Sequence, residues 1–549
     1  MTRWMPWLTS VANFSIIITS PPPVTPLLRI LKFFYNPSKA WEAAKNFSHP
    51  RVVAMLFFGF SAGLPILLIF SSLSLWLREA GIQRSAVTFF SWAALGYSFK
   101  FIWAPLVDQM PIPVMTRRLG RRRAWILLAQ ICIAAAIFAM SMIDPAKAEN
   151  CLSLMALAAV ALGFSSATQD IAIDAYRIES AGEELQALMA SVYIAGYRIG
   201  MLAAGAGALF IAQIQGSTPG AYDYTAWRTA YQIMAGLMAI GMMTVFVIKE
   251  PAITEKEATC ARNRDHARFF ILFLISAAAF VGWFYFSSGI ASTLKEQVAL
   301  VVKNHSAAGF IVETARLAAG LCSALLAARV MVALKVANME MIRSAYVEPV
   351  SDFFLRYGAG LAWLLLALIG LYRISDIVLG VISNVFYQDM GFSKIHIASI
   401  VKTFGLFMTI AGGFLGGTLS IQFGVMRILF AGALLSALTN LLFVLMAWTG
   451  PALPMLYLVI SADNLAGGLA GAAFVAFLSS LTNVRFTAVQ YAVFSSLMTL
   501  VPKVFSGYSG AMVDQLGYPV FFTITAVMGI PVLILILICG VKLQVKDRR

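Results

Sequence analysis

Long apolar segments, separated by short polar or basic loops, recur along almost the whole chain. A helix of about 20 residues crosses a hydrocarbon core of about 30 Å, so each segment is expected to span a membrane. Six segments, then two, then six more are predicted. They lie near residues 52–77, 86–107, 124–143, 151–176, 187–213, 229–248, 269–292, 307–334, 358–387, 396–419, 427–448, 454–480, 488–511 and 519–540.

Polar stretches divide these segments into related halves. An internal repeat of six plus six helices is typical of transporters that place their solute between the halves, near the membrane midplane. The pattern predicts an all-α polytopic membrane protein with about fourteen transmembrane helices. Its expected parts are a cytoplasmic amino-terminal arm (1–51), a six-helix bundle (52–248), a cytoplasmic linker (249–268), two additional helices (269–334), a cytoplasmic amphipathic linker (335–357), a second six-helix bundle (358–540) and a cytoplasmic tail (541–549).

The composition excludes a soluble protein. Of the 549 residues, 60% are hydrophobic and 12% are charged, against about 25% charged residues in soluble domains. The net charge of +15 would suggest nucleic acid binding in a soluble protein. Here most Lys and Arg residues fall in loops on the side of the amino terminus, so the charge indicates orientation, with both termini in the cytoplasm.

Ionisable residues nevertheless occur inside the predicted spans. Each costs about 2.5–3.5 kcal/mol if it faces lipid at a helix centre. They are therefore expected to face one another or water, along a pathway for a solute. The acids are Asp170, Asp174, Asp376 and Asp463, and the bases are Lys100, Arg198, Arg316, Arg329, Arg373, Lys402 and Lys503.

Two of the acids, Asp170 and Asp174, lie one helical turn apart in the segment ATQDIAIDAYRIES (167–180). Neighbouring carboxylates repel each other, so one is expected to hold a proton near neutral pH, as proton coupling requires. Gating ion pairs and a purely structural role are the alternatives. The four acids Asp170, Asp174, Asp376 and Asp463 are the candidates for proton coupling.

Other charged and polar residues have simpler interpretations. Arg177 and Lys100 lie near helix ends and are expected to reach the membrane interface. Arg316 is expected to pair with Glu313 within its own helix. The polar and aromatic side chains of Tyr193, Tyr197, Arg198, Asn384, Asn464 and Gln490 suit sugar hydroxyl and amide groups, although they also suit ordinary packing between helices.

The loop APLVDQMPIPVMTRRLGRRR (104–123) resembles a motif of the major facilitator superfamily. In that motif an acid ends one helix and a basic run with a glycine opens the next. The matching residues, Asp108, Arg118, Gly120, Arg121 and Arg122, form a candidate gating loop. A basic cytoplasmic loop with a turn glycine would explain the arginines alone. The second half has a similar loop, GGTLSIQFGVMR (416–427), which lacks the acid.

Several further segments resemble the AmpG-type muropeptide permeases of that superfamily. They are SSATQDIAIDAYR (165–177), GYRIGML (196–202), SFKFIWAPLVD (98–108), YRISD (372–376), VKTFGLFMTIAGGFLGG (401–417) and DNLAGGLAGAAFVAFLSSLTN (463–483). The resemblance covers residues 50–540. Carried over by position, it implies functional roles for Gln169, Asp170, Asp174, Tyr197, Arg198, Asp376, Lys402 and Asn464. With Arg373, the substrate-binding candidates are then Gln169, Tyr193, Tyr197, Arg198, Arg373, Asn384, Lys402, Asn464 and Gln490.

The function that this resemblance implies is import of N-acetylglucosaminyl-1,6-anhydro-N-acetylmuramyl peptides across the bacterial inner membrane. Transport would be driven by protons and would serve peptidoglycan recycling and β-lactamase induction. A monomer that contacts lipid, the muropeptide and protons, with no cofactor, metal or nucleic acid, is expected. The alternatives are a carrier of another solute, such as acetyl-coenzyme A, and a membrane-embedded enzyme. The dispersed histidines and the missing P-loop disfavour the enzyme and an ATP-driven pump.

Overall fold

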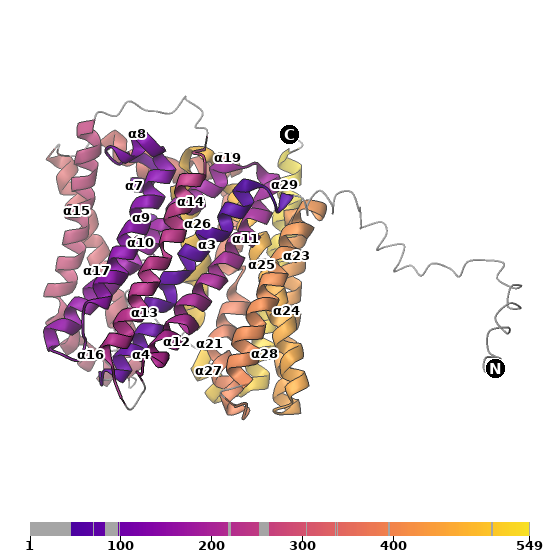
Figure 1. Ribbon diagram of the computed structural model, residues 1–549. Coiled ribbons are helices and arrows are strands. Elements are labelled where there is room, and N and C mark those ends of the chain that lie inside the picture. The colour runs from indigo at the N-terminus through magenta and orange to yellow at the C-terminus, as the bar shows by residue number, and fades with distance from the viewer. Residues whose placement is uncertain are drawn as a thin grey trace, which may run out of the picture.

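The computed structural model describes residues 46–69, 71–82, 97, 99–217, 221–251, 263–302, 305–334, 336, 339–393, 396–506 and 509–547, which are almost entirely helical (Figure 1). Within this part of the chain, 13 helices are long and apolar enough to cross a membrane. Each overlaps one of the predicted spans. The remaining predicted span, near 86–107, falls mostly outside the described residues, as do most of the predicted arm (1–51) and much of the linker 249–268.

The first group of helices forms what we call the N-terminal bundle. Glycines bring α3 and α11 into backbone contact. A Cβ atom at Gly59, Gly63, Gly196 or Gly200 would lie 2.0–2.2 Å from a backbone oxygen of the other helix, which leaves no room for any side chain. The bundle contains α3 (Pro50–Ile69), α4 (Ser71–Glu79), the 3₁₀ helix η2 (Lys100–Ile102), α7 (Ala104–Gln109), α8 (Met115–Leu119), α9 (Arg121–Ser141), α10 (Glu149–Ser180), α11 (Glu183–Leu202), the π-helix η3 (Ala203–Gly207), α12 (Ala208–Ile214), α13 (Tyr224–Leu237) and α14 (Ala239–Val247).

The last group forms the C-terminal bundle, which has its own apolar core. Here α23 and α25 touch through Gly412, Gly416 and Gly468, where a Cβ would lie 2.1–2.6 Å from a backbone oxygen of the partner helix. The bundle contains α20 (Ala359–Leu371), α21 (Ile374–Asp389), the π-helix η6 (Ile397–Phe404), α23 (Gly405–Phe423), α24 (Val425–Thr449), α25 (Leu453–Leu481), the 3₁₀ helix η7 (Val484–Phe486), α26 (Thr487–Ser506), α27 (Ser509–Leu516), α28 (Tyr518–Val527) and α29 (Gly529–Asp547).

Between the bundles in sequence, α15 (Asn263–Phe286) and α17 (His305–Ala333) pack against each other. Figure 1 places this flanking pair at the outer side of the N-terminal bundle, away from α23 and α24. Only 11% of the apolar window of each helix is buried, against 72% for α25, so most of the pair's surface is available to lipid.

The predicted span near 269–292 is wrong at its carboxyl end, because α15 ends at Phe286 and a separate helix, α16 (Ser288–Val302), follows. Arg316 of α17 explains the break. Its guanidinium donates to the carbonyl of Phe284 and to Ser287 Oγ (2.9 Å), and it stacks on the Phe284 ring at 4.7 Å. A cation there satisfies carbonyls at the end of α15. The expected partner, Glu313, has a side chain outside the described part of the chain.

The amphipathic linker folds as a nearly continuous helix, which we call the strap (residues 339–357). It consists of α18 (Met339–Ile342), the π-helix η5 (Arg343–Val347) and α19 (Glu348–Tyr357). The strap lies at the end of the molecule that carries α8, which we call the α8 end (Figure 1). At the seam between the bundles, α11 packs on α23 and α25, while α7 and α10 pack on α26.

Candidate functional site

The two acids of α10 have different surroundings. Asp174 lies 3.9 Å from Lys100 Nζ and 3.2 Å from Arg177 Nη2. Asp170 accepts a hydrogen bond from the Tyr193 hydroxyl at 3.3 Å, and no described cation lies within ion-pair distance of it. One acid is therefore neutralised by two cations, whereas the other is held by a neutral donor.

Arg177 does not turn outward to the lipid headgroups, and the sequence interpretation of this residue was wrong. Its side chain is 1% exposed. Besides Asp174 it donates to Gln186 Oε1 at 3.0 Å and to Ser479 Oγ at 2.8 Å, and it lies 5.2 Å from the centre of the Tyr491 ring. Ser479 and Tyr491 belong to the C-terminal bundle, so Arg177 connects the two bundles.

The expectation that Lys100 reaches the membrane interface was also wrong. Its side chain is 9% exposed and turns toward Asp174, so it does not reach the headgroups. Lys100 begins a short 3₁₀ turn. The direction of its side chain therefore could not be inferred from its position along the apolar segment.

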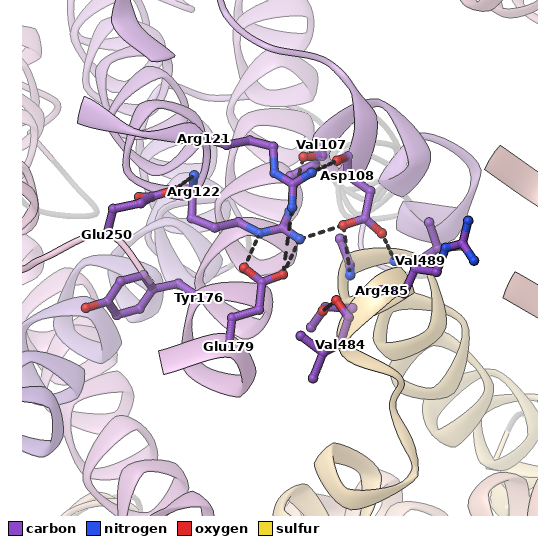
Figure 2. Close-up of polar contacts among 12 residues, drawn as sticks. Val107, Asp108, Arg121, Arg122, Tyr176, Glu179, Glu250, Val484, Arg485 and Val489 are labelled. Carbon is purple, nitrogen blue, oxygen red and sulfur yellow. Dashed lines mark hydrogen bonds and ion pairs between the residues drawn. The ribbon is translucent and has the colours of Figure 1, made fainter. Parts of the chain in front are cut away.

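The candidate gating loop also links the bundles, through Asp108 (Figure 2). The carboxylate accepts hydrogen bonds from the backbone amides of Ala488 (3.3 Å) and Val489 (3.1 Å), in the first turn of α26. An acid there satisfies free N–H groups and the positive end of the helix dipole. Arg122 Nη2 holds the same carboxylate at 2.6 Å.

Arg122 is the centre of this loop network. It is 1% exposed and also binds Glu179, with Nε 2.9 Å from Oε2 and Nη2 2.5 Å from Oε1. Arg121 donates to the backbone carbonyl of Asp108 at 2.5 Å. Arg118, by contrast, is exposed on α8 and takes no part in these contacts.

The position of Gly120 in this network requires a glycine, for its backbone angles and for the space beside it. Its φ of 92° and ψ of 169° fall in a region that only glycine occupies readily. A Cβ there would lie 2.3 Å from Cδ of Glu250, whose carboxylate accepts from the amides of Arg122 (2.8 Å) and Arg123 (3.1 Å) at the start of α9. Burial raises the pKa of Glu250, against the opposing effect of these two amides.

In the C-terminal bundle the candidate charges form a second group. Arg373, at the break between α20 and α21, lies 3.6 Å from Asp376. Asp463 of α25 accepts from Thr439 Oγ1 at 3.4 Å and lies within electrostatic range of Asp376 and Arg373. The side chains of Arg373 and Asp376 keep 34% and 20% exposure, so other side chains do not fully enclose this pair.

Arg198 faces the C-terminal bundle from α11. Ala187 and Ser191 lie against Gly417, and Ile194 lies against Gly471. Arg198 continues this face at the next helical spacing. It lies within electrostatic range of Arg373 across the seam, and its guanidinium lies 3.9 Å from Met201 Sδ. Among the described residues no carboxylate lies within ion-pair distance of Arg198.

The remaining candidates lie apart from this group. Gln169 is fully buried inside the N-terminal bundle, where its amide donates to Ser61 Oγ at 3.2 Å. Asn464 accepts from Thr409 Oγ1 at 2.9 Å, between α25 and α23. Gln490 is buried at the α8 end, where it binds the strap.

The last four candidates are Lys402, Tyr193, Tyr197 and Asn384. Lys402 has an exposed side chain on η6. The rings of Tyr193 and Tyr197 lie beside each other on α11, with centroids 6.2 Å apart. Asn384 lies on α21, but its side chain is outside the described part of the chain.

Several residues of the site were not predicted from the sequence: Gln186, Glu179, Glu250, Ser479 and Tyr491. Each is unremarkable within its own segment and acquires a role only through a partner far along the chain. A small cleft of about 200 Å³ lies beside Arg177. It is lined on one side by Ile178, Gly182 and Gln186, and on the other by Val425, Ser479 and Val484.

Comparison with known proteins agrees with this architecture. The family model for the Major Facilitator Superfamily matches residues 52–339. A transporter named AmpG 4 from Rickettsia felis is 29% identical over 91% of this chain and 99% of its own length. The anhydromuropeptide permease of Escherichia coli K12 is 28% identical over 91% of this chain and 81% of its own length.

Two solved structures of transporters share this fold. The proton:xylose symporter XylE has a TM-score of 0.55 at 13% identity, covering 91% of this chain and 95% of its own. FucP in its outward conformation has a TM-score of 0.56 at 12% identity, covering 90% of this chain and 99% of its own. The chain therefore belongs to the major facilitator superfamily, and AmpG-type permeases are among its relatives there.

Proposed function

We propose that this protein imports anhydro-muropeptides across the bacterial inner membrane by proton-coupled alternating access, for peptidoglycan recycling. The name of the Escherichia coli relative, anhydromuropeptide permease, supports this class of solute over 91% of the chain. The arginines at 117, 118 and 121–123 lie at the α8 end. The positive-inside rule therefore assigns that end to the cytoplasm.

The main observation behind the proposal is that Asp174 is linked through Arg177 to the contact between the two bundles. Asp174 holds Arg177, and Arg177 reaches Ser479 and Tyr491 of the other bundle. Neutralising Asp174 would free Arg177 from one of its partners and weaken its grip across the seam. The charge on α10 can thereby influence whether the α8 end is closed.

Asp170 is the better site for a proton that enters and leaves during each cycle. It lies one turn from Asp174, so a negative charge on one opposes a negative charge on the other. Unlike Asp174, it has no described ion-pair partner, and its contact with the Tyr193 hydroxyl survives in either protonation state because a hydroxyl can donate or accept.

The proposal is tested by uptake of labelled anhydro-muropeptide into membrane vesicles, with and without an imposed pH gradient. The wild type should take up the solute faster with the gradient. Asp170→Asn should lose that gain, and Asp174→Asn should lower uptake by loosening Arg177. Asp514→Asn changes an exposed acid of α27 and should behave as the wild type. Equal gradient dependence in all of these proteins would remove Asp170 and Asp174 from the coupling role.

Arg198 and Arg373 supply the positive charge for an acidic part of the solute. They come from different bundles, lie within electrostatic range of each other, and Arg373 keeps 34% exposure. Arginine binds carboxylates through two parallel hydrogen bonds, and the stem peptide of a muropeptide carries carboxylates. A carboxylate between the two arginines would relieve their repulsion and draw the bundles together.

Arg198→Gln should raise the KM for a muropeptide with free carboxylates by about tenfold or more, the usual effect of losing a charge-assisted hydrogen bond. It should leave the KM for the amidated peptide nearly unchanged. Arg329→Gln is the control, since Arg329 is an exposed arginine of α17, a helix of the flanking pair. Identical losses for the free and the amidated peptides would contradict a carboxylate site.

A further inference from the structure

The strap binds the N-terminal bundle through its first part. The Tyr346 hydroxyl donates to the backbone carbonyl of Ile102 at 2.7 Å, and Gln109 Nε2 donates to Ser344 Oγ at 3.4 Å. Ala345 between them is fully buried in the core of that bundle. Burial raises the pKa of Tyr346, so its hydroxyl keeps the proton that it donates.

The second part of the strap binds the C-terminal bundle through more hydrogen bonds. Asp352 accepts from Asn483 Nδ2 at 3.0 Å and from Gln490 Nε2 at 2.9 Å. Arg356 donates to the carbonyl of Leu481 at 3.1 Å and to Gln490 Oε1 at 3.0 Å. Phe353 is buried in the core of the C-terminal bundle.

These contacts hold the segment 481–490, which leads into α26. The first amides of α26 are the donors to Asp108, through Ala488 and Val489. The strap therefore binds the same segment, 481–490, that Asp108 of the gating loop binds from the N-terminal bundle. Fixing segment 481–490 keeps these amides in place for Asp108.

The residues of the first bound part, Ser344, Ala345 and Tyr346, lie in the π-helical segment η5, and the second bound part lies in α19, which follows it. Such π-helical segments interrupt the regular hydrogen-bond ladder of an α-helix and often lie at functional sites. The flanking pair supports the first part, because Phe269 of α15 and Met331 of α17 share the core that buries Ala345. The Phe269 and Tyr346 rings lie 6.3 Å apart.

We infer that the strap is a clasp across the seam, which stabilises the closed α8 end in addition to Asp108 and Arg177. When this end opens, the strap releases Ile102 and Gln109 and stays with the C-terminal bundle, where it makes more hydrogen bonds. The flanking pair then serves to seat the first part of the clasp. This inference rests on the alternating-access part of the proposed function and is independent of the solute.

The test measures the distance across the α8 end in the full-length protein in lipid nanodiscs. Spin labels are attached to unnatural amino acids at positions 117 and 484, which are exposed and lie on opposite bundles. Tyr346→Phe removes the hydrogen bond to Ile102 and keeps the ring. It should raise the ratio of long to short distances by roughly two- to tenfold, the value of one hydrogen bond. Asp352→Asn should shift the ratio in the same direction.

Tyr285→Phe is the matched control, because the Tyr285 side chain is 76% exposed on α15, and it should leave the distances unchanged. Wild-type distance ratios in both Tyr346→Phe and Asp352→Asn would overturn the inference, as would a single short distance in every protein. If the wild type does not take up muropeptide but the variants shift the distance ratio as expected, then the assigned solute is wrong and the inference about the strap still holds.

Discussion

Replacing Arg122 by glutamine is expected to lower the stability of the protein more than any other single change at the α8 end. Arg122 is 1% exposed and holds both Asp108 and Glu179. Its loss leaves the buried carboxylate of Asp108 without its cation and leaves Glu179 with only Arg121, whose Nη2 is 4.0 Å away. Breaking a buried pair in this way costs about 3–5 kcal/mol. Thermal unfolding in detergent, monitored as loss of the monodisperse species, should have a clearly lower midpoint for Arg122→Gln than for the wild type.

Two further variants separate the charge effect from the loss of side-chain volume. Arg118→Gln changes an exposed arginine of the same loop and should melt with the wild type. Adding Asp108→Asn and Glu179→Gln to Arg122→Gln removes the stranded charges, so part of the lost stability should return. A midpoint for Arg122→Gln equal to that of Arg118→Gln would show that the buried network does not stabilise the fold.

Arg177→Lys is expected to reduce muropeptide uptake strongly while keeping the positive charge beside Asp174. One guanidinium contacts Asp174, Gln186 and Ser479 together. A lysine ammonium cannot present donors in that planar arrangement. Losing a buried, charge-assisted contact between the bundles costs about 1.5–3 kcal/mol, or roughly a ten- to hundredfold shift between closed and open states. Uptake into vesicles and the distance across the α8 end should both change.

The partners of Arg177 provide the controls. Ser479→Ala removes one acceptor in the C-terminal bundle, so it should show a smaller shift in the same direction as Arg177→Lys. Tyr491→Phe keeps an aromatic ring beneath the guanidinium but removes the hydroxyl that also contacts Arg177, so it should show a smaller shift than Arg177→Lys. If Arg177→Lys transports like the wild type, then the contact between the bundles at this point does not control opening.

The arrangement of helices followed from the sequence because span length is a local property. An apolar run of about 20 residues forms a membrane helix whatever surrounds it, and each of the 13 helices found by length and composition overlaps a predicted span. The end of α15 was misjudged because the residue that breaks it, Arg316, comes from a different helix.

Residue roles were harder to predict because they depend on which helices come together. Arg177 lies at the end of an apolar run, where an arginine commonly reaches the interface, yet helices α25 and α26 cover it. Gln490 was a candidate for solute binding, but its amide is occupied by Pro349, Asp352 and Arg356. Nothing in the local pattern of either residue indicates these distant partners.

Asp108 and the pair Asp170 and Asp174 were easier to recognise. Acids inside an apolar span are costly, so the presence of Asp170 and Asp174 alone indicates a role. Asp108 was recognisable because it ends a helix just before a basic loop, as in the superfamily motif. The sequence could not show that Asp174 has cations and Asp170 has a hydroxyl. That difference comes from Lys100 and Tyr193, which lie on other helices.

The small cleft beside Arg177 has a consequence for inhibition. One wall belongs to α10 and α11 and the other to α24, α25 and η7, so any rocking of the bundles must alter its shape. Its volume of about 200 Å³ is below the roughly 300–1,000 Å³ of pockets for drug-sized ligands, which suits a fragment. We expect a compound that fits there to act as a wedge that holds the two bundles in one arrangement.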